Sequence, residues 1–332
     1  MYFIFACLAL LFWSGSDLFS KMGTYQKDKS SHWRVIFFVG LIMGVHAIIC
    51  IIVSHFIPAP AEDAPSEWWR SLIYTDFVAM DFVRYLPVAF IYLAAMVVGY
   101  VGLRYVELSI SSPVCNSSGS LAFVICVILG CAGLEELSAN ELAFTIVGVV
   151  LITFGILFLS IVEYKEDEET RLLRQDNKNF KYTKSLWAIL IPIIYLVLDA
   201  LGTVGDQVVA EFEIFEISEY AANTAFEFTS LCFAIFAFIF LKAVKKQKIF
   251  AIPKENTRAL IIGGTCETFG QIFYMSVMFS DFKAGMPMIS AYCVLSVVWS
   301  RIFLKEKLSV NHYLAIITTF IGIILLGIFS PV

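Results

Sequence analysis

The pattern of hydrophobic and polar positions divides the chain into ten long apolar runs separated by polar segments. A helix needs about 20 apolar residues to cross the hydrocarbon core of a bilayer, and these runs are close to that length. The runs are continuous rather than alternating, so they predict membrane-spanning helices and not the strands of a spanning barrel. They cover approximately residues 2–20, 35–56, 86–106, 111–133, 142–162, 185–205, 222–243, 258–280, 285–304 and 311–330.

The composition agrees with this pattern, because 59% of the residues are apolar and only 15% are charged. A soluble domain averages about 25% charged residues. All eight cysteines lie in the apolar runs, where we expect free thiols that behave as small apolar side chains. The sequence contains no Cys/His cluster and no phosphate-binding GxxxxGK[ST] loop. We therefore expect no metal, no cofactor, no nucleotide-driven motor and no nucleic-acid partner.

Two similar polar corners, 135–140 (EELSAN) and 306–311 (EKLSVN), precede the fifth and tenth runs. Each corner follows an apolar run that opens with a proline, Pro113 in the first half and Pro287 in the second. This shared order predicts an internal duplication, a feature of many transporter folds. We expect a first five-helix repeat over residues 1–164, a cytoplasmic linker over 165–184 and a second five-helix repeat over 185–332.

Lys and Arg mark the cytoplasmic loops of membrane proteins. All but three of the 23 Lys and Arg residues lie in or beside the odd-numbered loops, and the three are Arg70, Arg84 and Lys283. We therefore expect the odd loops in the cytoplasm and both termini on the extracytoplasmic side of the cell membrane. Because each half contains five runs, the second half is inverted relative to the first. The predicted fold is an all-α polytopic membrane protein with ten transmembrane helices in two inverted five-helix repeats.

The long loop between the second and third runs has its own pattern. Its apolar residues recur at helical spacing, with charged residues between them, which predicts an amphipathic helix on the outer surface. A cap packed on the protein explains the same pattern equally well. The apolar residues are Trp68, Trp69, Leu72, Ile73 and Phe77.

These features together resemble the EamA-type transporters of the drug/metabolite transporter superfamily. The resemblance rests on ten runs in two inverted halves, on a Glu–Leu–Ser corner before the last helix of each half, and on Trp13-Ser14 in the first run. It covers nearly the whole chain. It implies a basket of ten helices around a central cavity that carries small metabolites, often amino acids, frequently outward. The long loop after the second run and the extra acids within the runs depart from that family.

Acidic residues within apolar runs point to the chemistry of the protein. A charged group at the bilayer centre costs about 2.5–3.5 kcal/mol on insertion scales, so it persists where a cavity, a partner or a function holds it. Asp17 follows Trp13 by four residues, and Asp199 follows Tyr195 by four. An inverted duplication brings these pairs to matching places, where an aromatic ring beside a carboxylate suits an ammonium group.

Simpler interpretations stay open for several of these residues. Asp17 lies four positions before Lys21, which also fits an ion pair at a helix end. Glu227 also fits a hydrogen bond to a neighbouring helix. The candidate substrate-binding or proton-coupling residues are Trp13, Ser16, Asp17, Tyr92, Met96, Tyr100, Asn116, Ser117, Tyr195, Asp199, Glu227, Glu267, Gln271, Tyr274, Ser290 and Tyr292.

The leading hypothesis is a secondary active transporter, an exporter or exchanger of a small zwitterionic or cationic metabolite such as an amino acid or amine. It works by alternating access in the lipid bilayer as a monomer or homodimer, with protons or another ion as candidates for coupling. A multidrug or organic-cation exporter is the alternative within this class. An intramembrane enzyme using Asp17 and Asp199 belongs to another class, and the sequence lacks the glycine-flanked aspartate pattern that it would require.

Overall fold

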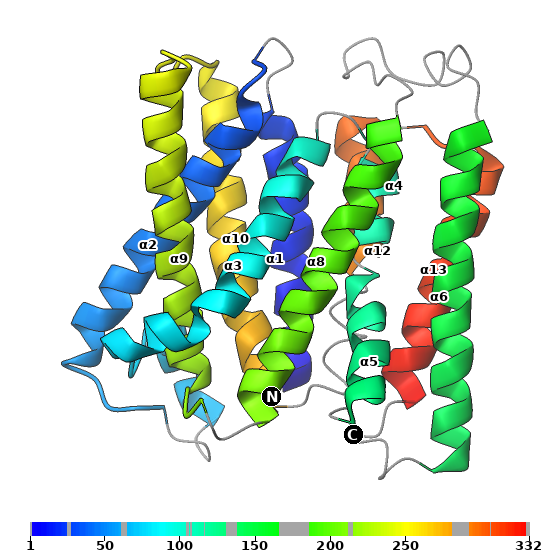
Figure 1. The fold of residues 1–332 in the computed structure, drawn as a ribbon, viewed down its shortest axis with the longest axis horizontal. Helices are drawn as coiled ribbons and strands as arrows, with labels where there is room; N and C mark the ends of the chain where they lie inside the picture. Colours follow the sequence, from blue (N-terminus) through cyan, green and yellow to red (C-terminus); the bar gives the residue numbers. More distant parts are fainter. Residues whose placement is uncertain are drawn as a thin grey trace.

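The computed structural model describes most of the chain as a bundle of long helices (Figure 1). Within the described residues every regular element is helical. The described residues are 2–24, 28–60, 65–103, 106, 108–115, 117–130, 138–165, 186–211, 215–280, 292–305 and 307–329.

The first half of the chain contributes six α-helices and one short 3₁₀ helix to the described structure. Each of the five apolar runs of this half falls on one of these helices or on a broken pair. The elements are α1 (Tyr2–Gly23), α2 (Ser31–Ser54), η1 (Pro65–Leu72), α3 (Ala79–Gly102), α4 (Leu108–Cys115), α5 (Ser118–Leu129) and α6 (Ala139–Lys165).

The second half contributes five α-helices, two of which continue into a π-helical turn. The elements are α8 (Leu186–Glu211), α9 (Glu219–Ile239) with η3 (Phe240–Val244), α10 (Lys254–Ser280), α12 (Tyr292–Trp299) with η4 (Ser300–Leu304), and α13 (Val310–Phe329). Pro287 lies outside the described residues.

The fourth apolar run differs from the prediction of one continuous helix over 111–133. It forms two helices, α4 and α5, and Ser117 lies in a turn between them. Serine and glycine are poor helix formers compared with the Leu and Ala of the other runs, and Ser117, Ser118 and Gly119 lie at this junction. Pro113 lies inside α4 rather than at the opening of a helix.

Helices of the first half pack mainly against helices of the second half. The principal pairs are α1 with α10, α2 with α9, α3 with α8 and α6 with α13. Figure 1 places the start of α1 and the end of α13 at the same end of the bundle. The two halves therefore share one interface instead of forming separate bodies.

Small residues permit the closest of these contacts. A Cβ added to Gly40 of α2 would lie 2.1 Å from the Ser230 carbonyl oxygen of α9. A Cβ added to Gly322 of α13 would lie 2.6 Å from the Gly148 carbonyl oxygen of α6. Backbone atoms at these distances leave no room for a side chain, as is typical of helix contacts inside membranes.

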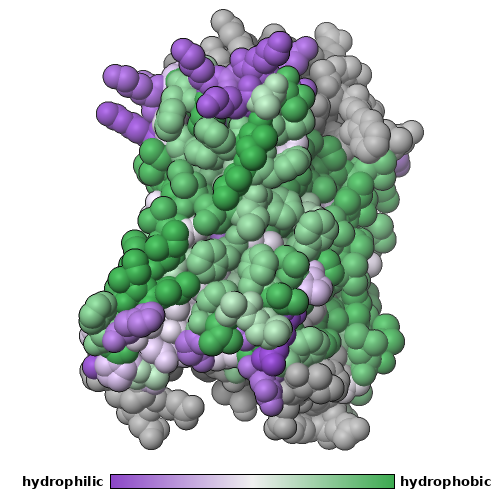
Figure 2. Space-filling view, turned by 60° about the vertical axis from the view of Figure 1, so that its left-hand side comes forward, coloured by the Kyte–Doolittle hydropathy of each residue, from purple (hydrophilic) through white to green (hydrophobic). Residues whose placement is uncertain are grey.

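The outer surface of the bundle is apolar over most of its height. Figure 2 shows a continuous hydrophobic band between two hydrophilic ends. Six of the described helices are long and apolar enough to cross a membrane: Ile4–Gly23, Ser31–Ser54, Ala79–Gly102, Ala139–Leu159, Leu190–Ala210 and Glu219–Val244. This band has the polarity that lipid contact requires.

Candidate functional site

A buried cavity of about 110 Å³ lies within the bundle. Helices α1, α3, α4, α5, α8, α9, α10 and α12 contribute its wall. Twelve of the predicted site residues line it: Trp13, Ser16, Asp17, Tyr92, Met96, Tyr100, Tyr195, Asp199, Glu267, Gln271, Tyr274 and Tyr292.

Four predicted residues do not belong to this group. Ser117 is buried at the junction of α4 and α5 but is not part of the cavity wall. Glu227 lies against His46, at a second and smaller cavity bordered by Asn223. Asn116 and Ser290 lie outside the described residues.

Asp17 is held by hydroxyl groups from two neighbouring helices. Its Oδ2 accepts hydrogen bonds of 2.9 Å from Ser112 of α4 and of 2.9 Å from Ser296 of α12. Lys21 Nζ instead donates to the backbone carbonyl oxygens of Leu103 and Val106 beyond the end of α3. Asp17 and Lys21 therefore have different hydrogen-bond partners and do not form the ion pair that their spacing also allowed.

Asp199 has a related environment on α8. Its Oδ2 accepts a hydrogen bond of 2.5 Å from Ser118 at the start of α5. Glu267 of α10 is the third acid in the cavity wall, and the Ser16 hydroxyl lies within its hydrogen-bonding reach. Three carboxyl groups from three helices therefore line one cavity.

Aromatic rings form the wall beside these acids. The Trp13 ring lies 4.9 Å from the Tyr274 ring and 5.6 Å from the Tyr292 ring, measured between centroids. Tyr195 and Tyr100 line the same space. Aromatic faces attract organic cations, most strongly where water is excluded.

Sequence reasoning missed the role of Asp206, which lies immediately behind the wall. Its carboxyl accepts hydrogen bonds from the hydroxyls of Tyr85, Tyr92 and Tyr274. Tyr92 and Tyr274 line the cavity, so this buried acid connects α3, α8 and α10 around it. Asp206 lies seven residues after Asp199, which places both on one face of a helix, and that spacing was the available signal.

Several hydrogen-bond donors in the wall have no partner within the part of the chain that the structure describes. Trp13 Nε1, Gln271 Nε2 and the Tyr100 hydroxyl are buried and have no hydrogen-bond partner among the described residues. A buried polar group without a partner costs about 1–3 kcal/mol, so such groups need an explanation. All three residues line the cavity, where a bound molecule would satisfy them.

Residues 212–328, which include α9, α10, α12 and α13, match the family model of the EamA-like transporter family. This part of the chain is EamA-like. This confirms the resemblance inferred from the sequence, and it identifies a transporter family rather than an enzyme family. The EamA-like chain is thus a multi-pass membrane protein, and the enzymatic alternative built on Asp17 and Asp199 is set aside.

The fold of the EamA-like chain also occurs in solved structures. One crystal structure superposes on it with a TM-score of 0.59 at 12% sequence identity. The match covers 98% of this chain and 96% of the other. At this identity the likeness concerns the fold alone. A search of curated protein sequences found no match to the EamA-like chain.

Proposed function

We propose that this EamA-like chain is a secondary active transporter, an exporter or exchanger of a small zwitterionic or cationic metabolite, which works by alternating access. An amino acid fits the cavity best. The observation that carries this proposal is the joint presence of three carboxyl groups and several unpaired donors in one buried, aromatic-walled cavity.

The acids favour a ligand with an ammonium group. Asp17, Asp199 and Glu267 line the cavity, and no Lys, Arg or His is among its described lining residues. A carboxylate taken out of water needs hydrogen bonds and an opposite charge to compensate its lost hydration. An ammonium group supplies a positive charge and up to three donors to such acceptors.

The unpaired donors favour a carboxylate on the same ligand. Trp13 Nε1 is a donor only, and Gln271 Nε2 carries two hydrogens. A purely cationic substrate would leave these donors unsatisfied, whereas the carboxylate of an amino acid accepts from both. The aromatic contacts of Trp13 with Tyr274 and Tyr292 keep an organic-cation exporter as the second candidate, because ring faces bind cations that carry no N–H group.

The packing supports ten crossings arranged as two inverted repeats, residues 1–164 and 185–332, joined by the linker 165–184. In these repeats α1 corresponds to α8, α2 to α9, α3 to α10 and α5 to α12. If corresponding helices are exchanged, the α1–α10 contact becomes α8–α3 and the α2–α10 contact becomes α9–α3. In the same way the α5–α8 contact becomes α12–α1. All of these contacts occur in the bundle. In such a repeat the substrate site lies near the bilayer midplane between the halves, which is a geometry for alternating access.

The orientation follows from the charges at the ends of the bundle. Four lysines lie at or just beyond the end of α9, at the end opposite to the start of α1 (Figure 1). We propose that this lysine-bearing end faces the cytoplasm of the cell, with both termini outside. The lysines are Lys242, Lys245, Lys246 and Lys248.

The test is uptake by vesicles that contain the purified full chain. Labelled neutral amino acids are compared with the corresponding primary amines, amino-acid amides and N-acetylated amino acids, and with tetramethylammonium. The proposal expects uptake of the free amino acids, weaker uptake of amines and amides, and none of the N-acetylated forms. Preferential uptake of tetramethylammonium would favour the organic-cation exporter. Equal uptake of N-acetylated and free amino acids would contradict a site built on acids.

A further inference from the structure

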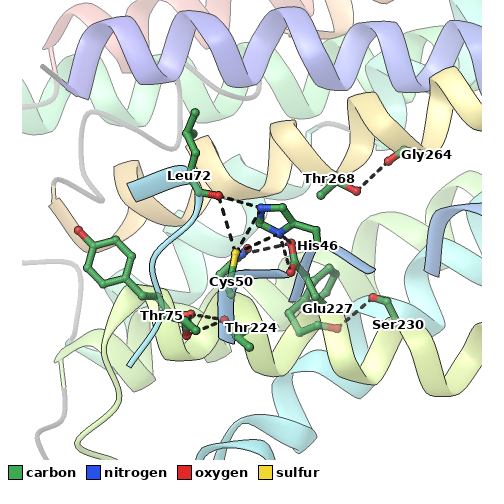
Figure 3. Close-up of polar contacts among 12 residues, drawn as sticks. His46, Cys50, Leu72, Thr75, Thr224, Glu227, Ser230, Gly264 and Thr268 are labelled. Carbon is green, nitrogen blue, oxygen red and sulfur yellow. Dashed lines mark hydrogen bonds and ion pairs between the residues drawn. The ribbon is translucent and has the colours of Figure 1, made fainter. Parts of the chain in front are cut away.

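A second polar cluster lies away from the cavity, where α2, α9 and the loop after η1 meet (Figure 3). His46 Nδ1 lies 2.8 Å from Glu227 Oε1 and 2.9 Å from Oε2. His46 Nε2 lies 2.8 Å from the Leu72 carbonyl oxygen. The Glu227 side chain is fully buried and that of His46 is 16% exposed. Both ring nitrogens therefore face oxygen atoms at hydrogen-bonding distance in a largely dry site.

The number of hydrogens in this cluster is fixed by its geometry. A carbonyl oxygen only accepts, so the contact with Leu72 requires a hydrogen on His46 Nε2. A neutral imidazole then has a bare lone pair on Nδ1, which faces Glu227. The second contact becomes a hydrogen bond only if Nδ1 or the Glu227 carboxyl carries one more proton. The pair thus holds one proton beyond those of a neutral histidine and an ionised glutamate.

The same cluster anchors the segment that follows η1. The Thr75 backbone N–H donates to Ser54 Oγ at 2.7 Å, and Thr224 Oγ1 donates to Thr75 Oγ1 at 2.8 Å. Thr75 Oγ1 also donates to the Tyr220 carbonyl oxygen at 3.3 Å. Leu72 and Phe77 pack against the hydrophobic core. This packing favours the cap interpretation of the loop over an amphipathic helix lying free on the surface.

Among the described residues, few other titratable side chains lie near His46 and Glu227. Cys50 Sγ lies 3.5 Å from His46 Nε2, and Tyr74, Glu219 and Tyr220 line an adjoining cavity of about 10 Å³. The described lining residues from α10 are Ile272, Met275 and Ser276, none of which is ionisable.

The adjoining cavity is bordered by His46 itself. Its volume of about 10 Å³ is close to the smallest space that holds one water molecule. Burial, and then the charge of Asp76, raise the pKa of Tyr74, so this side chain stays a neutral phenol that can contact such a water.

We infer that His46 and Glu227 form a proton-binding site that latches residues 72–78 onto α2 and α9. When the proton is bound, both ring nitrogens bond their acceptors and the segment stays docked. When the proton leaves, the Nδ1 lone pair faces a carboxylate, and the repulsion turns the ring away from the Leu72 carbonyl. The His46–Glu227 site does not depend on which substrate the central cavity binds.

The wild-type chain in lipid nanodiscs supplies the first test. Nitrogen NMR of ring-labelled histidine, with His46 assigned by difference from H46Q, reports whether Nδ1 carries a proton. Infrared difference spectra between the wild type and E227Q report a protonated Glu227 carboxyl. The proposal expects one of these two signals under conditions in which the segment is docked. A docked segment beside a neutral His46 and an ionised Glu227 would overturn it.

Hydrogen exchange of the peptide spanning residues 72–78 tests the latch. His46→Gln should lose protection at every pH. Glu227→Gln should keep it, because an amide N–H can donate to Nδ1 of a neutral ring, and any loss of protection with rising pH should disappear. Thr224→Val is the matched control, since it removes a contact of Thr75 without a titratable group and should lower protection equally at all pH values. Unchanged protection in H46Q, or a wild-type pH dependence in E227Q, would overturn the latch.

Discussion

Asp17 on α1 and Asp199 on α8 line the same cavity, and each accepts a hydrogen bond from a serine of a helix that belongs to the fourth or ninth run. Asp17 bonds Ser296 of α12, and Asp199 bonds Ser118 of α5. Exchange of the two halves of the chain converts one arrangement into the other. The two acids therefore have related surroundings, although Asp17 also accepts a hydrogen bond from Ser112 of α4.

Replacement of Asp199 by asparagine should strongly weaken binding of an ammonium-bearing substrate. A hydrogen bond to a charged group contributes about 1.5–3 kcal/mol, which corresponds to a loss of about 10- to 100-fold in affinity. Asp17→Asn should act in the same direction, because its carboxyl lines the same cavity. Substrate titration with purified protein, followed by vesicle uptake, measures both effects.

Ser118→Ala is the control for this prediction. It removes the hydroxyl that bonds Asp199 but leaves the charge, so its effect should be much smaller than that of the asparagine variant. Uptake by the Asp199→Asn variant at the wild-type rate, with an unshifted pH profile, would remove Asp199 from the mechanism.

Gln271→Leu should change selectivity rather than abolish binding. The variant loses an unpaired amide donor in the cavity wall and keeps a similar shape. Affinity for an amino acid should fall by about 10-fold, the effect of one hydrogen bond of about 1.4 kcal/mol, whereas affinity for the corresponding amine should hold. Competition assays with the two ligands measure the ratio. Equal losses for both ligands would argue against contact between Gln271 and a carboxylate.

Variants of the tyrosines around Asp206 should distinguish effects on stability from effects on ligand binding. Tyr85 is fully buried and does not line the cavity, so Tyr85→Phe should lower stability by about 1–3 kcal/mol and leave ligand affinity unchanged. The Tyr92 hydroxyl also bonds Asp206, but Tyr92 lines the cavity. Tyr92→Phe should therefore lower both stability and ligand affinity. Thermal unfolding in detergent, with and without ligand, distinguishes the two. A change of affinity in Tyr85→Phe would show that Asp206 positions the wall.

Gly40→Ala should weaken the contact between α2 and α9. The added Cβ would meet the Ser230 carbonyl oxygen at 2.1 Å, and a backbone atom can move aside only if the helices separate. We expect a destabilisation of about 1–3 kcal/mol, seen as a lower midpoint of thermal unfolding. Gly15→Ala is the comparison, because its Cβ would meet the Cys266 side chain at 3.3 Å, which can adjust. Equal stability of the two variants would contradict the tight contact.

Much of the cavity could be predicted from residue types alone. Acids and clustered aromatics in apolar runs are costly or unusual unless a cavity holds them, and Asp17, Asp199 and Glu267 all line one. Glu227 follows the same logic but lies elsewhere, because it contacts His46 of α2. No local pattern distinguishes an acid that faces a cavity from one that faces a histidine on another helix.

By itself the sequence determined where most of the apolar helices lie, because hydrophobic continuity is a property of neighbouring residues along the chain. It also predicted the resemblance to the EamA-like transporters, which the family model matches over residues 212–328. Only the tertiary structure decided which polar groups meet, such as Asp206 with three tyrosines and His46 with Glu227. These partners come from helices far apart in sequence, and their contacts depend on how each helix is rotated and packed. Rotation is set by the close fit of the whole bundle, which no single segment encodes.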